Sequence, residues 1–89
     1  MATINIKTQI PGPKSKQLLE KWHKYEADVV GYQAQIVWDR AKGCVVNDVD
    51  GNTFIDWTSG VLVTNVGHCH PHLVKATQQA SEYLLNNYE

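Results

Sequence analysis

The dipeptide Asp50-Gly51 constrains the fold of this chain most, because it separates two runs of residues that favour β-structure. Cys44–Val49 precedes it and Thr53–Trp57 follows it, and both runs are rich in β-branched and aromatic residues. An Asp-Gly pair between such runs is typical of a β-hairpin closed by a type I′ turn, in which both central residues have positive φ. We therefore predict two antiparallel strands joined at this dipeptide.

A third strand is expected on the N-terminal side of the hairpin. Ile36–Trp38 is short and apolar, and Ala41–Gly43 supplies a turn in which glycine is available for a positive φ. The sequence thus predicts a three-stranded antiparallel meander with one apolar face. A sheet of this size needs something else to cover that face.

Two helices are expected to flank the sheet, which makes the fold class α+β. The first runs from about Lys16 to Asp28, with Ser15 able to cap its start and Gly31 near its end. Residues 1–14, where two prolines surround a glycine, form an extended lead-in. The second helix runs from Pro71 to about Leu85. The apolar residues at helical spacing are Leu18, Leu19, Trp22, Tyr25 and Val29 in the first helix, and Leu73, Ala76, Ala80 and Leu84 in the second.

Between the sheet and the second helix lies an apolar segment, Thr58–His70. It contains Gly60 and Gly67 and no charged side chain. We expect a loop there, with at most a short extended piece at Val61–Val63. An apolar loop of this length is typical of a segment that is buried in an interface or lines a pocket.

Composition argues against several classes of function. The 89 residues make one domain or part of one, and the net charge of −1 is spread along the chain without the basic stripe that nucleic-acid binding requires. No apolar stretch reaches the roughly 20 residues that span a bilayer, and the N-terminus lacks the pattern of a signal peptide. Cys44 and Cys69 are too few for a disulfide framework, so we expect reduced thiols and a cytoplasmic protein.

Three alternating histidines, His68, His70 and His72, surround Cys69 and suggest metal ligands at first sight. However, Pro71 interrupts the spacing that helical zinc sites use, and no second element offers the remaining ligands. We therefore predict no metal site. Instead, one or two of these imidazoles should hydrogen-bond the loop backbone and cap the helix that follows.

No residue of the chain makes a strong case for catalysis. Asp48, Asp50 and Asp56 are expected to be structural, and the turn itself explains Asp50. A lysine that forms a Schiff base needs desolvation or a cationic neighbour, and every lysine here lies in a polar context. The lysines are Lys7, Lys14, Lys16, Lys21, Lys24, Lys42 and Lys75.

Taken in order, three segments resemble the N-terminal signature of the class III, pyridoxal-phosphate-dependent aminotransferases. They are Asp48–Trp57, Ser59-Gly60-Val61 and Asn65–Pro71. The opening Ile10–Ser15 and the leucine-rich helix after it most resemble the 4-aminobutyrate aminotransferase branch. The resemblance implies a PLP fold-type I enzyme, usually a homodimer with active sites at the subunit interface, of which residues 15–89 would be an N-terminal small-domain segment.

The resemblance also implies roles for the apolar loop. Val61 would contact substrate, while Ser59 and Gly60 would let the backbone approach it closely. Asn65, Gly67 and His68 would support this active-site loop. The intact enzyme would move an amino group from a 4-aminobutyrate-like donor to a 2-oxo acid such as 2-oxoglutarate. By the same resemblance, the main anchors of pyridoxal 5′-phosphate and the catalytic lysine lie outside this chain, which we expect to be inactive by itself.

Two alternatives remain open from the sequence. In the first alternative to the aminotransferase hypothesis, the chain is a non-catalytic truncated module that docks on a full-length subunit through Ser59–Gly67. In the second, it is a free-standing small α+β domain with an unrelated role. In the first alternative the apolar loop is an interface, and in the second it has to be covered by the chain itself.

Overall fold

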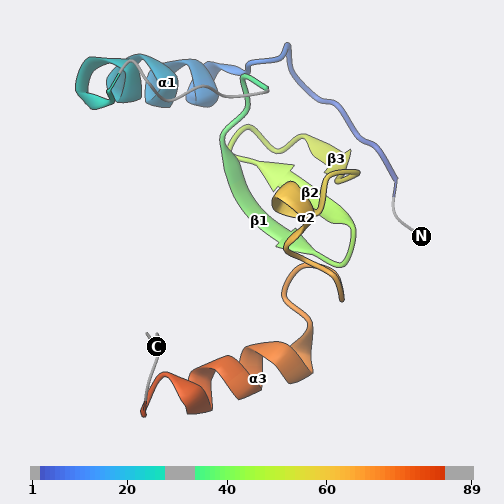
Figure 1. Ribbon diagram of the computed structural model, residues 1–89. Coiled ribbons are helices and arrows are strands. Elements are labelled where there is room, and N and C mark those ends of the chain that lie inside the picture. The colour runs from blue at the N-terminus through green and yellow to red at the C-terminus, as the bar shows by residue number, and fades with distance from the viewer. Residues whose placement is uncertain (1–2, 28–33, 84–89) are drawn as a thin grey trace.

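The computed structural model describes residues 3–27 and 34–83, and it confirms an α+β fold with a three-stranded antiparallel sheet (Figure 1). The helices are α1 (Pro13–Tyr25), α2 (Ser59–Leu62) and α3 (Pro71–Ala80), and the strands are β1 (Trp38–Lys42), β2 (Val45–Asp48) and β3 (Thr53–Ile55). Among the described residues, no helix is both long enough and apolar enough to cross a membrane.

The sheet is the predicted meander, in the order β1-β2-β3, but the first strand was placed too early. β1 begins at Trp38 and continues through Ala41 and Lys42, which pair with Val46 and Val45 of β2. The turn between the two strands moves to Gly43, whose φ of +59° is easy for glycine and strained for other residues. The β2–β3 pairing places Val45 opposite Ile55, as expected for a hairpin.

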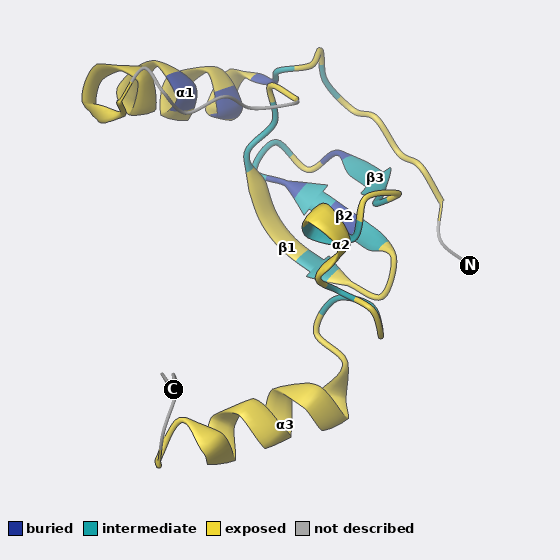
Figure 2. Ribbon diagram, viewed as in Figure 1, coloured by how far each residue is buried: buried dark blue, intermediate teal, exposed yellow. Residues whose placement is uncertain are grey.

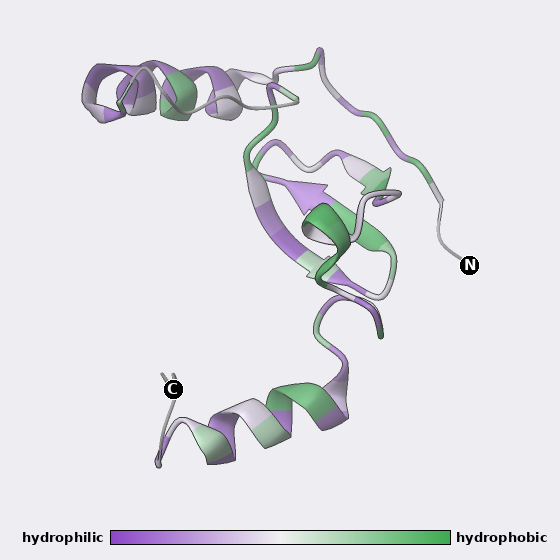
Figure 3. Ribbon diagram, viewed as in Figure 1, coloured by the Kyte–Doolittle hydropathy of each residue, from purple (hydrophilic) through white to green (hydrophobic). Residues whose placement is uncertain are grey.

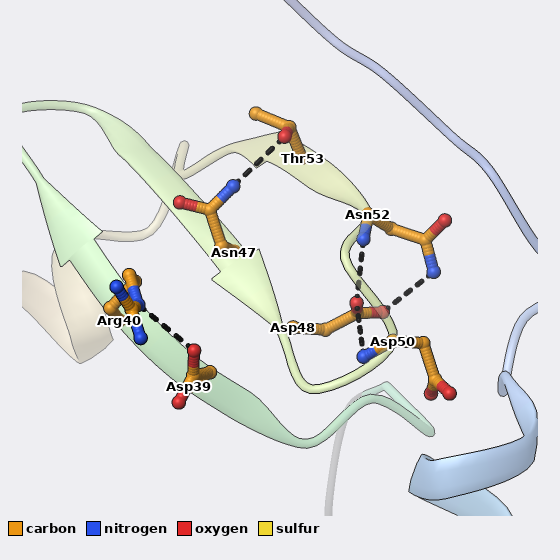
Figure 4. A network of polar contacts seen from close by, with 7 residues as sticks. All are labelled: Asp39, Arg40, Asn47, Asp48, Asp50, Asn52 and Thr53. Carbon is orange, nitrogen blue, oxygen red and sulfur yellow. Dashed lines mark hydrogen bonds and ion pairs between the residues drawn. The ribbon is translucent and has the colours of Figure 1, made fainter.

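The hairpin turn differs from the predicted type I′ geometry. Gly51 has a φ of +84°, but Asp50 does not have a positive φ. The Gly51 amide donates to the Asp48 carbonyl at 3.2 Å, and the Asp48 amide donates to the Asn52 carbonyl at 3.1 Å. This is the pattern of a three-residue connection with glycine at the left-handed position. The Asp48 carboxylate favours it, because one of its oxygens accepts from the backbone amides of Asp50 and Asn52 (Figure 4).

Helix α1 begins at Pro13, and its cap comes from the hairpin rather than from Ser15. The Asp50 carboxylate accepts from the amides of Lys14 at 2.7 Å and Ser15 at 3.0 Å, so it satisfies two of the free amides at the helix start. A Cβ on Gly12 would overlap this carboxylate. Burial raises the pKa of Asp50, but the hydrogen bonds from Ser15 and Lys14 outweigh it and leave the pKa lowered.

The lead-in is extended and is attached to the hairpin by Asn52, which is fully buried. The Asn52 side-chain oxygen accepts from the amides of Lys7 at 2.6 Å and Thr8 at 3.0 Å. Its side-chain nitrogen donates to Asp48 at 2.9 Å and to the Thr8 hydroxyl at 2.8 Å. Asn5 and Thr53 also form an isolated antiparallel bridge.

Both long helices end earlier than the sequence suggested. Helix α1 ends at Tyr25, and α3 ends at Ala80. The remaining residues that were expected in or beside these helices, Asp28, Val29, Gly31, Leu84 and Leu85, lie outside the described residues.

The apolar core of the described residues is very small. Leu19 and Val46 are the only buried hydrophobic residues there, whereas Ser15, Asp48 and Asn52 are buried and polar. Helix α3 is exposed along its length (Figure 2), and hydrophobic bands alternate with hydrophilic ones along it (Figure 3). The fold is therefore organised by buried polar contacts around the hairpin and leaves much apolar surface uncovered.

Candidate functional site

The apolar loop contains one turn of left-handed helix, α2, where the sequence suggested an irregular or extended segment. The φ angles are +53° at Ser59, +57° at Gly60, +65° at Val61 and +65° at Leu62. The Leu62 amide donates to the Thr58 carbonyl, and the Val63 amide to the Ser59 carbonyl, each at 2.8 Å. For L-amino acids this conformation costs about 1–2 kcal/mol per residue, so the surrounding structure has to hold it.

The carboxylate of Asp56, just after β3, lies at the start of this turn. One oxygen accepts from the amides of Thr58 at 2.8 Å and Ser59 at 3.0 Å, and from the Thr58 hydroxyl at 2.9 Å. The other oxygen lies 2.6 Å from Nε2 of His68. The two side chains are nearly buried, with 3% of Asp56 and 13% of His68 exposed.

This environment strongly favours the charged form of Asp56. The hydrogen bond with His68 and then the amide of Thr58 lower the pKa of Asp56 from 3.8 to about 2, and they outweigh the opposing effect of burial. At neutral pH the carboxylate is therefore ionised, and it acts as an acceptor for every donor around it.

The other end of the loop is fixed to the turn between β1 and β2. His68 and Gly43 exchange two backbone hydrogen bonds, at 2.8 and 2.9 Å. Gly67 has a φ of +88°, and a Cβ at this position would lie 3.0 Å from the Gly43 Cα. The Trp38 ring meets the His68 ring edge-on, with 5.8 Å between centroids. Glycine at position 67 is thus required both by its φ and by the close approach of backbone.

An apolar groove runs from the sheet to this loop, with a volume of about 640 Å³. Gly60 and Val61 of the loop line it, as do Val46 and Phe54 of the sheet. A smaller polar cavity of about 370 Å³ includes Asn65. The remaining groove residues are Trp22, Ala34, Ile36, Trp38, Ile55, Asp56, Trp57 and Thr58.

The structure brings most of the sequence-predicted site residues together. Ser59, Gly60 and Val61 lie in the left-handed turn. The Asp56 carboxylate contacts both the Ser59 amide at the start of this turn and the ring of His68. The sequence predicts an ordinary structural role for Asp56, whereas the structure places its carboxylate between the left-handed turn and His68. The run Asp56-Trp57-Thr58-Ser59 did carry a signal, because an aspartate accepts readily from amides two and three residues later.

Two of the three alternating histidines, His68 and His70, make side-chain hydrogen bonds within the loop and at the start of α3. Nδ1 of His70 accepts from the His72 amide at 3.3 Å, which confirms that an imidazole caps α3. His68 differs from the prediction, because its ring pairs with a carboxylate rather than with loop backbone. Within residues 3–27 and 34–83, no group of three His, Cys, Asp or Glu side chains is placed to hold a metal ion. Cys44 and Cys69 are free and exposed.

Comparison with known proteins identifies the class to which the chain belongs. Residues 27–87 match the family Aminotransferase class-III. The acetylornithine aminotransferase of Methanosarcina acetivorans is 40% identical over 81 residues, which are 91% of this chain and 20% of that protein. The chain therefore belongs to the class III aminotransferase family, and it spans about a fifth of the length of such relatives.

Two further relatives are named for 4-aminobutyrate and for ornithine. The 4-aminobutyrate aminotransferase of Mycobacterium tuberculosis is 39% identical over 77 residues, which are 85% of this chain and 17% of that protein. The ornithine aminotransferase of Toxoplasma gondii, whose structure contains PLP at partial occupancy in its active site, matches with a TM-score of 0.70 and 27% identity over 79% of this chain and 16% of that one.

Proposed function

We propose that residues 15–89 are the N-terminal small-domain segment of a PLP-dependent aminotransferase, preceded by a lead-in over residues 1–14. The observation that carries this proposal is the left-handed turn of Ser59–Leu62, of which Gly60 and Val61 line an apolar groove. Strained backbone of this kind is concentrated at functional sites. Its presence in a member of the class III family supports a role for the turn in substrate binding.

In the proposed enzyme, Val61 contacts the amino donor and Gly60 lets backbone approach it closely. A small apolar side chain beside an apolar groove suits an unbranched aliphatic amine. The relatives are named for acetylornithine, ornithine and 4-aminobutyrate, which share such a chain. We propose a donor of the 4-aminobutyrate type, with a 2-oxo acid such as 2-oxoglutarate as acceptor.

The described residues do not themselves fit the cofactor. PLP would supply an electron sink for the reacting amine, and holding it would require a lysine of the protein. No lysine or arginine lines the groove, and every lysine of the chain is exposed. We propose that the cofactor's anchors and the catalytic lysine come from protein beyond these 89 residues, in a cytoplasmic homodimer, and that the chain alone is inactive.

The exposed apolar residues favour a second candidate, in which the chain is a non-catalytic module that docks on a full-length subunit. Val61, Leu62 and Val63 are exposed side by side, and Trp57 beside them is 88% exposed. A contiguous apolar surface of this kind marks an interaction site. Co-elution of the chain with a full-length class III aminotransferase in gel filtration would support docking.

A segment exchange tests the first proposal. The matching fifth of the Methanosarcina acetivorans relative is replaced by this chain, and the PLP-loaded chimera is assayed with acetylornithine, ornithine and 4-aminobutyrate against 2-oxoglutarate. Turnover with at least one of these amines is the expected result. A folded, PLP-loaded chimera without turnover of any of the three would overturn the proposal.

A further inference from the structure

The left-handed turn is not held by packing of its own side chains. Ser59, Val61 and Leu62 are all non-glycine residues with positive φ. Val61 and Leu62 are 72% and 81% exposed, so few contacts offset their strain. The conformation therefore depends on what fixes the loop around the turn.

Asp56 joins the start of the turn to the far end of the loop. Its first oxygen holds the amides of Thr58 and Ser59, where the turn starts. Its second oxygen holds the ring of His68, where the loop comes back to the sheet. The backbone of His68 is in turn bound to Gly43 between β1 and β2. One nearly buried carboxylate thus ties β3, the turn and the β1–β2 connection together.

We propose that Asp56 and His68 are positioning residues for the active-site loop: together they hold Ser59–Leu62 in the left-handed turn and so set where Val61 stands in the groove. This inference rests on the proposed function for the role of Val61, but not for the geometry. Asp56 and His68 act through the backbone of the turn. A local turn motif would require only the first oxygen of Asp56, whereas the proposed pair requires both oxygens.

A local turn motif and the Asp56–His68 pair predict different results for one substitution. Asp56→Asn keeps an oxygen for the amides of Thr58 and Ser59 but loses the charge that faces His68. If a local turn motif is sufficient, this variant retains the left-handed turn. If the pair holds the turn, the variant loosens it. Asp56→Ala removes both contacts and should abolish the turn.

The test is nuclear magnetic resonance of the whole 89-residue chain, comparing wild type with Asp56→Ala, Asp56→Asn and His68→Gln. Backbone couplings and carbon shifts report φ at Ser59–Leu62, while the shifts of Val46 and Phe54 report the sheet. Asp39→Ala is the matched control, because Asp39 makes an exposed ion pair with Arg40. We expect the positive-φ signature to disappear in Asp56→Ala and to weaken in Asp56→Asn and His68→Gln, with the sheet shifts kept.

The inference is overturned if Asp56→Asn and His68→Gln both keep wild-type couplings at Val61, or if the wild-type chain shows no positive φ there. Should Asp56→Ala unfold the whole chain, the two conservative variants still decide the question, since each preserves side-chain bulk. The readout is backbone geometry and involves no catalysis. The inference about positioning can therefore fail while the aminotransferase proposal stands, and the reverse also holds.

Discussion

The two ends of the β2–β3 hairpin use the same chemistry for different purposes. At one end, Asp48 and Asp50 accept hydrogen bonds from backbone amides and fasten α1 and the hairpin turn in relaxed conformations. At the other end, Asp56 accepts from backbone amides in the same way but fastens a strained left-handed turn. The Asp48 and Asp50 carboxylates thus stabilise relaxed backbone that builds the fold, whereas the Asp56 carboxylate contacts strained backbone in the candidate site.

The largest expected effect tests the strained end. Gly67→Ala places a methyl group 3.0 Å from the Gly43 Cα and also forces alanine to a φ of +88°. We expect it to reduce the free energy of unfolding by about 2–4 kcal/mol. Gly51→Ala is the control, because φ there is +84° but nothing lies within 4 Å of the added Cβ. It should cost about 1 kcal/mol. Equal losses in urea unfolding would show that the loop does not pack closely against Gly43.

The next effect tests the relaxed end. Asn52→Ala leaves the amides of Lys7 and Thr8 without their acceptor and removes a donor from buried Asp48. We expect a loss of about 2–3 kcal/mol in the free energy of unfolding, with faster amide exchange at the lead-in. Asn47→Ala is the control and should cost about 1 kcal/mol, since among the described residues the Asn47 side chain bonds only the Thr53 hydroxyl. Unchanged exchange at Lys7 and Thr8 would contradict this role of Asn52.

These two ends also show how far the sequence could be taken. The presence of three strands, their order and the position of the hairpin follow from local pattern, and so does the cap at His70, although β1 begins two residues later than predicted. The cap of α1 does not, because the Asp50 carboxylate reaches Lys14 across 36 residues of sequence. Left-handed backbone at Val61 contradicts its local preference, and the contacts of Asp56 and His68 that we propose to hold it come from tertiary structure. The residues of the candidate site were proposed from the sequence, but the geometry that the structure gives them depends on tertiary contacts.

A smaller effect, of opposite sign, is expected within the strained turn. Val61→Gly removes a β-branched residue from a φ of +65°, and Val61 is mostly exposed. We expect a gain of about 0.5–1 kcal/mol, because the relieved strain exceeds the entropy cost of glycine. Val63→Gly, one residue beyond the turn at φ −107°, should instead lose about 0.5–1 kcal/mol. In the chimera, Val61→Gly should raise KM for the amine. A Val61→Gly variant less stable than wild type would show that the turn is not strained there.

The smallest expected effect is a change in the pKa of Asp56 that Asp50 does not share. The pKa of Asp56 is about 2 in the folded chain, against an ordinary 3.8, so the folded state binds fewer protons than the unfolded state between these values. The stability that Asp56 contributes is therefore complete above about pH 4 and is lost as pH falls through 2.

His68→Gln removes the leading cause of the lowered pKa and should raise the pKa of Asp56 toward 3.8, while the lowered pKa of Asp50 stays unchanged because Ser15 and Lys14 still hold that group. Carbon shifts of both carboxyl groups, followed from pH 6 to about pH 1.5, measure this directly. Parallel changes in the pKa values of Asp50 and Asp56 would mean that the two ends of the hairpin respond as one unit. An unchanged pKa of Asp56 would mean that His68 does not hold the Asp56 carboxylate.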